Sequence, residues 1–159
     1  MTTSSLVLGD LIFPFFMFPL FPPFLAVAAI ADWLIDALVL WGILRLMHLE
    51  TQRPARFRLL WKLWGIGLLA DVAGSLLLTA LMLSPFGETG RFDPYDFYTS
   101  ALSTVIFLTA ILFSALLIFF FDRHILRKLF SPVQAGRIAL AFAVLTAPYT
   151  LLIPTSWFT

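Results

Sequence analysis

Long apolar runs separated by short polar connections dominate the chain. A membrane-spanning helix needs about 20 consecutive apolar residues, and the windows that meet or approach this are residues 24–46, 63–83, 97–121 and 133–153. The last window is long enough only if Arg137 extends toward the membrane surface. No segment alternates apolar and polar residues with a period of two, which disfavours a membrane β-barrel. The pattern predicts an all-α polytopic membrane protein, a four-helix transmembrane bundle forming one domain over residues 1–159.

A proline- and phenylalanine-rich segment precedes the first window. It carries Pro14, Pro19, Pro22 and Pro23 within the run "FPFFMFPLFPPF". Proline resists an interior helical position but is tolerated in the first turn. We therefore expect the first helix to begin at Pro22–Pro23. Residues 11–23 are too short to cross the membrane and too apolar for water, which predicts an interfacial or re-entrant segment.

Composition supports the membrane assignment and removes several functional classes. Of 159 residues, 61% are hydrophobic and only 12% are charged, whereas soluble domains are roughly a quarter charged. The chain has no cysteine, so no disulfide or thiolate metal site is expected. A net charge of +1 argues against a nucleic-acid partner. No catalytic, phosphate-binding or metal-binding motif is present, so we expect a non-enzymatic protein without a cofactor.

Basic residues lie almost entirely on one side of the predicted spans. Nine of the ten flank the first and third connections, and only Arg91 lies in the second. The positive-inside rule makes the basic side cytoplasmic. Both termini are then expected on the non-cytoplasmic side of a plasma or inner membrane. The same pattern predicts a cytoplasmic basic surface, formed by Arg53, Arg56, Arg58, Arg123, Arg127 and Lys128.

Three aspartates interrupt the apolar windows. Asp32 and Asp36 are four residues apart and share one helix face. Asp36 precedes Arg45 by nine residues and Asp71 follows Lys62 by nine. At 1.5 Å per residue each lies ~14 Å above the inner edge, near the middle of a hydrocarbon core ~30 Å thick. Two antiparallel neighbouring helices would thus bring Asp36 and Asp71 to the same level.

An aspartate at mid-membrane costs about 2.5–3.5 kcal/mol on insertion scales. Arg45 and Arg137, the candidate cations, lie near the inner edge and are poorly placed to compensate. Two close carboxylates cannot easily both ionise in a low dielectric. The sequence therefore predicts a binding site for a proton or a monovalent cation, formed by Asp32, Asp36 and Asp71 with oxygen donors from Ser75 and Thr79. Two alternatives are hydrogen bonding that only holds helices together, and pairing with a basic residue of a partner subunit.

Small residues mark the faces on which helices are expected to pack closely. One such face follows Gly67, Ala70 and Gly74. A second follows every fourth residue from Ala139 to Ala147. On the third window, polar and small residues recur at spacings of three and four, a seam formed by Ser100, Ser103, Phe107, Ala110 and Ser114.

These observations lead to one functional expectation and two alternatives. The leading interpretation is a small non-enzymatic membrane subunit of a homo- or hetero-oligomeric complex, whose aspartates serve ion or proton movement or partner pairing. The first alternative is an autonomous homo-oligomeric cation or proton channel or carrier. The second is a purely structural assembly factor.

Overall fold

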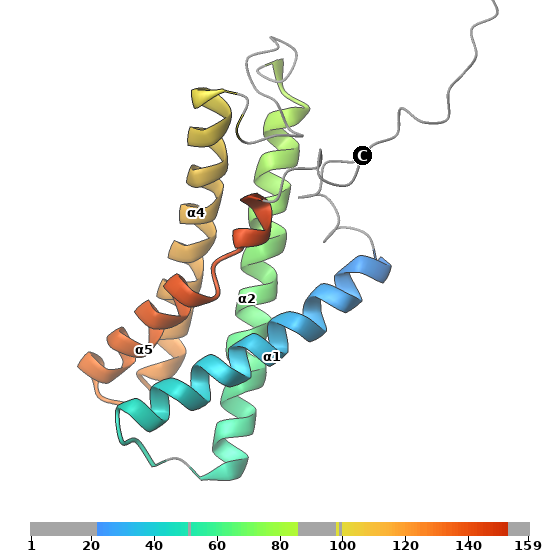
Figure 1. Ribbon diagram of the computed structural model, residues 1–159. Helices are drawn as coiled ribbons and strands as arrows, with labels where there is room; N and C mark the ends of the chain where they lie inside the picture. The colour runs from blue at the N-terminus through green and yellow to red at the C-terminus, as the bar shows by residue number, and fades with distance from the viewer. Residues whose placement is uncertain (1–21, 51, 86–97, 99, 153–159) are drawn as a thin grey trace, which may run out of the picture.

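The computed structural model describes residues 22–50, 52–85, 98 and 100–152. Within these residues every regular element is helical: α1 (Pro22–Leu46), α2 (Arg53–Met82), α4 (Ala101–Leu126), α5 (Pro132–Leu145) and the short 3-10 helix η2 (Tyr149–Leu152) (Figure 1). The all-α prediction is confirmed for this part of the chain. The predicted interfacial or re-entrant segment lies outside it, apart from Pro22 and Pro23.

Three stretches of the described chain are long and apolar enough to cross a membrane. These are Arg53–Met82, Ala101–Leu126 and Pro132–Leu152, the last combining α5 with η2. The chain therefore has the helices of a multi-pass membrane protein. The expected fourth span, residues 24–46, falls on α1 and is not among the three, so the four-span bundle is not confirmed.

Local sequence accounts for where the helices begin and end. The described part of α1 opens with Pro22 and Pro23, residues that the first turn of a helix tolerates. A proline also occupies the first turn of α2 and of α5, where its missing N–H is not needed. Ser131 and Gln134 form a reciprocal capping box at the start of α5. Helix α5 ends at Leu145, before Pro148, which cannot continue the helical hydrogen-bond pattern.

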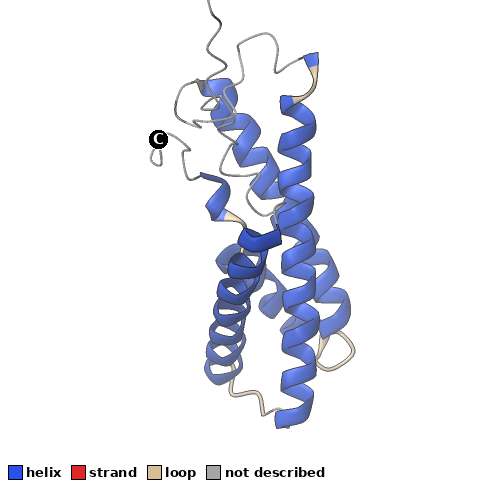
Figure 2. Ribbon diagram, turned by 90° about the vertical axis from the view of Figure 1, so that its right-hand side faces the viewer, coloured by secondary structure: helices blue, strands red, loops and turns tan. Residues whose placement is uncertain are grey.

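The long helices alternate in direction (Figure 1). At one end of the molecule, α1 and α4 end and α2 and α5 begin. Most of the arginines and lysines flank the two connections there. We therefore call it the basic end. Helix α1 runs obliquely across α2 and α5 instead of standing alongside them. Figure 2 shows from the side that the connections at the basic end are short loops.

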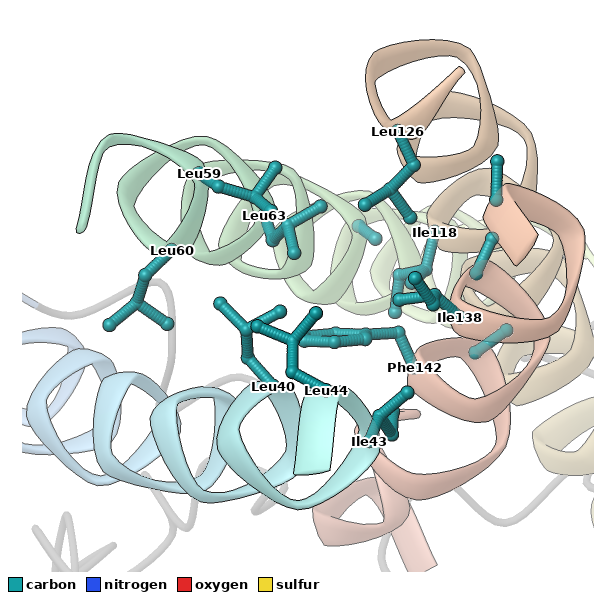
Figure 3. Packing of buried hydrophobic residues seen from close by; sticks show 14 residues of the cluster. Leu40, Ile43, Leu44, Leu59, Leu60, Leu63, Ile118, Leu126, Ile138 and Phe142 are labelled. Carbon is teal, nitrogen blue, oxygen red and sulfur yellow. The ribbon is translucent and has the colours of Figure 1, made fainter. Parts of the chain in front are cut away.

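The main hydrophobic core lies where all four long helices meet (Figure 3). Phe142 of α5 is 1% exposed, and its ring extends toward Leu40 and Leu44 of α1. Leu63 of α2 and Ile118 of α4 complete this layer. Each buried large apolar side chain contributes favourable packing and hydration free energy, so this core fixes α1 against the other three helices.

The packing faces expected from small residues are buried. Gly67, Ala70 and Gly74 all lie inside on α2. On α4 the seam predicted from Ser103 to Ser114 is buried and continues beyond it along the same face. Ser114 Oγ donates a hydrogen bond to Ala70 O at 2.9 Å, which joins α4 to α2. These contacts position the faces on which the aspartates lie.

Candidate functional site: a row of buried carboxylates

Asp32 and Asp36 of α1 both face Gly67 of α2. A Cβ atom placed on Gly67 would lie 3.6 Å from Asp32 Oδ2 and 3.7 Å from Asp36 Oδ2. The two carboxylates therefore converge on one point of the α2 surface, as their spacing of four residues predicts. Because glycine has no side chain, the α2 backbone is the surface that these oxygens meet.

Asp71 lies one helical turn beyond Gly67 on α2. Both α1 carboxylates are within electrostatic reach of it, and Asp32 acts on it more strongly than Asp36 does. The sequence predicted that Asp36 and Asp71 would be level. In the structure Asp71 lines one cavity together with Asp32.

A fourth carboxylate, Asp122 of α4, belongs to the same group. Its side chain is fully buried, and Asp36 is the charged residue that acts on it. The sequence interpretation missed Asp122 because it follows three phenylalanines and precedes Arg123, so it was assigned to the third connection. Steps of four residues from Ser114 lead through Ile118 to Asp122 and Leu126, all buried. Extending the seam along α4 would have found it.

The four aspartates form what we call the carboxylate row: Asp71, Asp32, Asp36 and Asp122, in the order of their electrostatic neighbours. The row begins in the middle of α2 and ends in the last turns of α4, near the basic end. No group of three or more acidic or histidine side chains in the described residues is arranged to hold a metal ion.

The row lacks internal compensation within the described residues. Each carboxylate has at least one buried oxygen without a hydrogen-bond partner, namely Asp32 Oδ2, Asp36 Oδ1, Asp71 Oδ1 and both oxygens of Asp122. The charged groups found to act on Asp36, Asp71 and Asp122 are themselves aspartates. Arg45 instead lies 5.2 Å over the Trp41 ring, and Arg137 is exposed. An isolated ionised carboxylate in such surroundings is strongly disfavoured.

A cavity of about 240 Å³ opens beside the middle of α2. Asp32 and Asp71 line it, together with Ser75, whose buried Oγ has no hydrogen-bond partner. The opposite wall is the break between α5 and η2, including Thr146 and Pro148. Non-helical backbone at membrane depth is tolerated where it is buried in protein or lines a polar cavity. The break and the carboxylates therefore face one another across this cavity.

The two predicted oxygen donors, Ser75 and Thr79, differ in position. Ser75 lies at the site, one turn after Asp71. Thr79 does not line the cavity, and its hydroxyl donates to Ser75 O at 2.8 Å within its own helix. Tyr149 lines the cavity, but its hydroxyl donates to the Val144 carbonyl.

Tryptophans hold α1 against α2 beside the row. Trp64 Nε1 donates to Ala29 O at 2.9 Å, a bond between the two helices. The rings of Trp33 and Trp61 lie 6.2 Å apart, centroid to centroid. These contacts stabilise the crossing at which the carboxylates of α1 meet α2.

The predicted basic surface divides into separate places at the basic end. Arg58 and Lys128 line a groove between α2 and α4. Arg53 and Arg56 line a shallow cavity against α1. Arg123 is half-buried, with its guanidinium 5.7 Å from the Phe119 ring, and Arg127 is exposed. The six side chains therefore share an end of the molecule without forming one continuous patch.

Comparison with protein-family models, curated proteins and solved structures finds no match to this chain.

Proposed function

We propose that this chain is a small non-enzymatic subunit of an oligomeric membrane complex, in which the carboxylate row binds and relays protons. The single observation that carries this proposal is that aspartates from three helices, two of them buried and two half-buried, lie near one another with unpartnered oxygens and no compensating base within the described residues. Ionisable residues inside a membrane are costly, and they commonly mark ion or proton pathways.

A proton suits the row better than a metal cation does. A cation needs several oxygen ligands around one point, and among the described residues no group of three or more acidic or histidine side chains is arranged to hold one. A proton can reside on one carboxyl group at a time, and a neutral carboxylic acid is the form that buried surroundings favour. A monovalent cation held with the help of a partner chain is the related alternative.

The cavity supplies an entrance to one end of the row. It exposes Asp32 and Asp71 beside a break in a membrane-crossing stretch. Broken helices that face acidic or polar groups near the membrane midplane are a recurring feature of transporter binding sites. Asp122 lies at the other end, next to Arg123. In this proposal α1 lies within the membrane as a fourth helix, and the basic end faces the cytoplasm.

Partner pairing is the second candidate, and the half-exposed position of Asp32 favours it. Asp32 lines a cavity that is open to the outside of the chain. A lysine or arginine from a neighbouring subunit could enter there and neutralise the first carboxylates. This arrangement would hold a complex together without moving protons.

Proton flux into liposomes tests the proposal. The complex is purified in mild detergent and reconstituted with a trapped pH-sensitive dye, and a potassium diffusion potential drives proton entry. We expect Asp36→Asn, Asp71→Asn and Asp122→Asn each to lower the flux at least about tenfold, a factor typical of losing a positioned proton-transfer group. Asparagine keeps much of the shape and hydrogen bonding but cannot carry the proton.

Ser114→Ala is the matched control, because Ser114 is equally buried and polar but already has a partner. It should leave the flux near the wild-type level. Intact complexes with unchanged flux in all three Asn variants would contradict a proton relay. Loss of the complex itself on Asp32→Asn would instead support partner pairing. Flux through the purified chain alone would support the autonomous channel or carrier.

A further inference from the structure

A groove of about 550 Å³ runs between the start of α2 and the end of α4 at the basic end. Three basic side chains line it: Arg58 and Lys62 from α2, and Lys128 from the connection that follows α4. All three are exposed. The rest of the lining is apolar, including the buried Leu59 and the exposed Leu129, and no acidic side chain contributes to it. We call this feature the α2–α4 groove.

The composition of the groove matches two parts of one molecule. An arginine fork and two lysine ammonium groups are suited to a phosphate group. The adjoining leucines suit hydrocarbon. Both kinds of surface occur together at the ends of two helices that are long and apolar enough to cross a membrane. This is the level at which lipid head groups give way to acyl chains.

From this charge complementarity we propose that the α2–α4 groove binds an anionic phospholipid of the leaflet at the basic end. The phosphate contacts Arg58, Lys62 and Lys128, and the first part of an acyl chain lies against Leu129. Basic pockets between membrane helices bind anionic lipid head groups in this manner. The inference does not depend on the carboxylate row, since no residue of the row lines the groove.

Lipid binding to the purified full-length protein tests this assignment. Native mass spectrometry would compare phosphatidylglycerol with phosphatidylcholine of the same acyl chains. We expect tighter binding of the anionic lipid, and a loss of at least ~10-fold in its affinity when Arg58→Gln, Lys62→Gln and Lys128→Gln are combined. Phosphatidylcholine binding should change little.

A matched triple variant removes three charges from the same end outside the groove: Arg53→Gln, Arg127→Gln and Arg137→Gln. We expect it to retain most of the affinity for phosphatidylglycerol. Circular dichroism and thermal unfolding would establish that both variants are folded to the same extent. If the groove variant proves unfolded, the single substitution Lys128→Gln replaces it, with Arg127→Gln as its control.

Three results would overturn the proposal. Equal losses in the two variants would show that general basic charge attracts the lipid. Equal affinity for phosphatidylcholine and phosphatidylglycerol would show that the groove does not select the anionic head group. Competition by soluble glycerol phosphate at the same concentration as the lipid would assign the groove to a free phosphate. The lipid-binding experiment does not measure proton flux. A failure of the lipid proposal can therefore be distinguished from a failure of the proposed function.

Discussion

Gly67 and Gly74 lie two turns apart on α2, and each faces polar side chains of another helix. At Gly74 the neighbour is Ser114 of α4, which stands so close that an added Cβ would collide with its Oγ. The serine hydroxyl is already satisfied by Ala70 O. At Gly67 the neighbours are Asp32 and Asp36 of α1, at ordinary van der Waals distance from an added Cβ, and both have an unpartnered oxygen.

The contrast separates two uses of polar residues inside a membrane protein. At the Gly74 crossing the packing is close and the Ser114 hydroxyl has a partner on α2, which is how a polar group joins two helices. The Gly67 crossing leaves costly carboxylates without partners, which does not stabilise the fold. The proposed proton relay assigns these carboxylates a role other than packing.

The largest stability effect is expected at the packed crossing. Gly74→Ala should lower the free energy of unfolding by ~1–3 kcal/mol, because the new methyl group meets Ser114 Oγ and the nearby Ala110 carbonyl in a filled space. Unfolding in mixed detergent micelles, followed by tryptophan fluorescence, would measure the change.

A double-mutant cycle supplies its control. Ser114→Ala alone should cost about 1 kcal/mol through loss of the interhelical hydrogen bond. Ser114→Ala also removes the oxygen with which the new methyl group would collide. Gly74→Ala should therefore lower the free energy of unfolding less in the Ser114→Ala background than in the wild type. Strictly additive effects would show that the two residues do not meet as described.

A much smaller effect is expected at the carboxylate crossing. Gly67→Ala should leave stability unchanged or raise it by up to ~1 kcal/mol, since alanine favours the helix and its methyl group has room. The same unfolding assay applies. A loss of stability as large as that caused by Gly74→Ala would mean that the two crossings are equally tight. It would contradict the difference between them described above.

Much of the local structure could be predicted from the sequence. A proline follows the end of α5, and small residues marked the buried faces of α2 and α4. The spacing of Asp32 and Asp36 correctly placed both on one face. Each of these features depends on residues close together in the chain, so local periodicity is enough to find them.

The remaining features depend on how helices cross. The oblique path of α1 across α2 involves core contacts with Phe142 and Leu63, which are far along the chain. The cavity requires the break at Pro148 to face α2, a relation that no local pattern contains. Asp122 was overlooked because two adjacent charged residues, Asp122 and Arg123, are typical of the end of a membrane span. The face of α4 that carries Asp122 is nevertheless buried.

Infrared difference spectroscopy tests most directly whether these carboxyl groups are neutral and able to exchange protons. A protonated carboxylic acid has a C=O stretching band that an ionised carboxylate lacks. At neutral pH the wild-type protein in lipid should show this band, which declines as the pH is raised and weakens separately in Asp36→Asn and Asp122→Asn. A wild-type spectrum with only ionised carboxylate bands at neutral pH, unaltered by these substitutions, would contradict the proton relay.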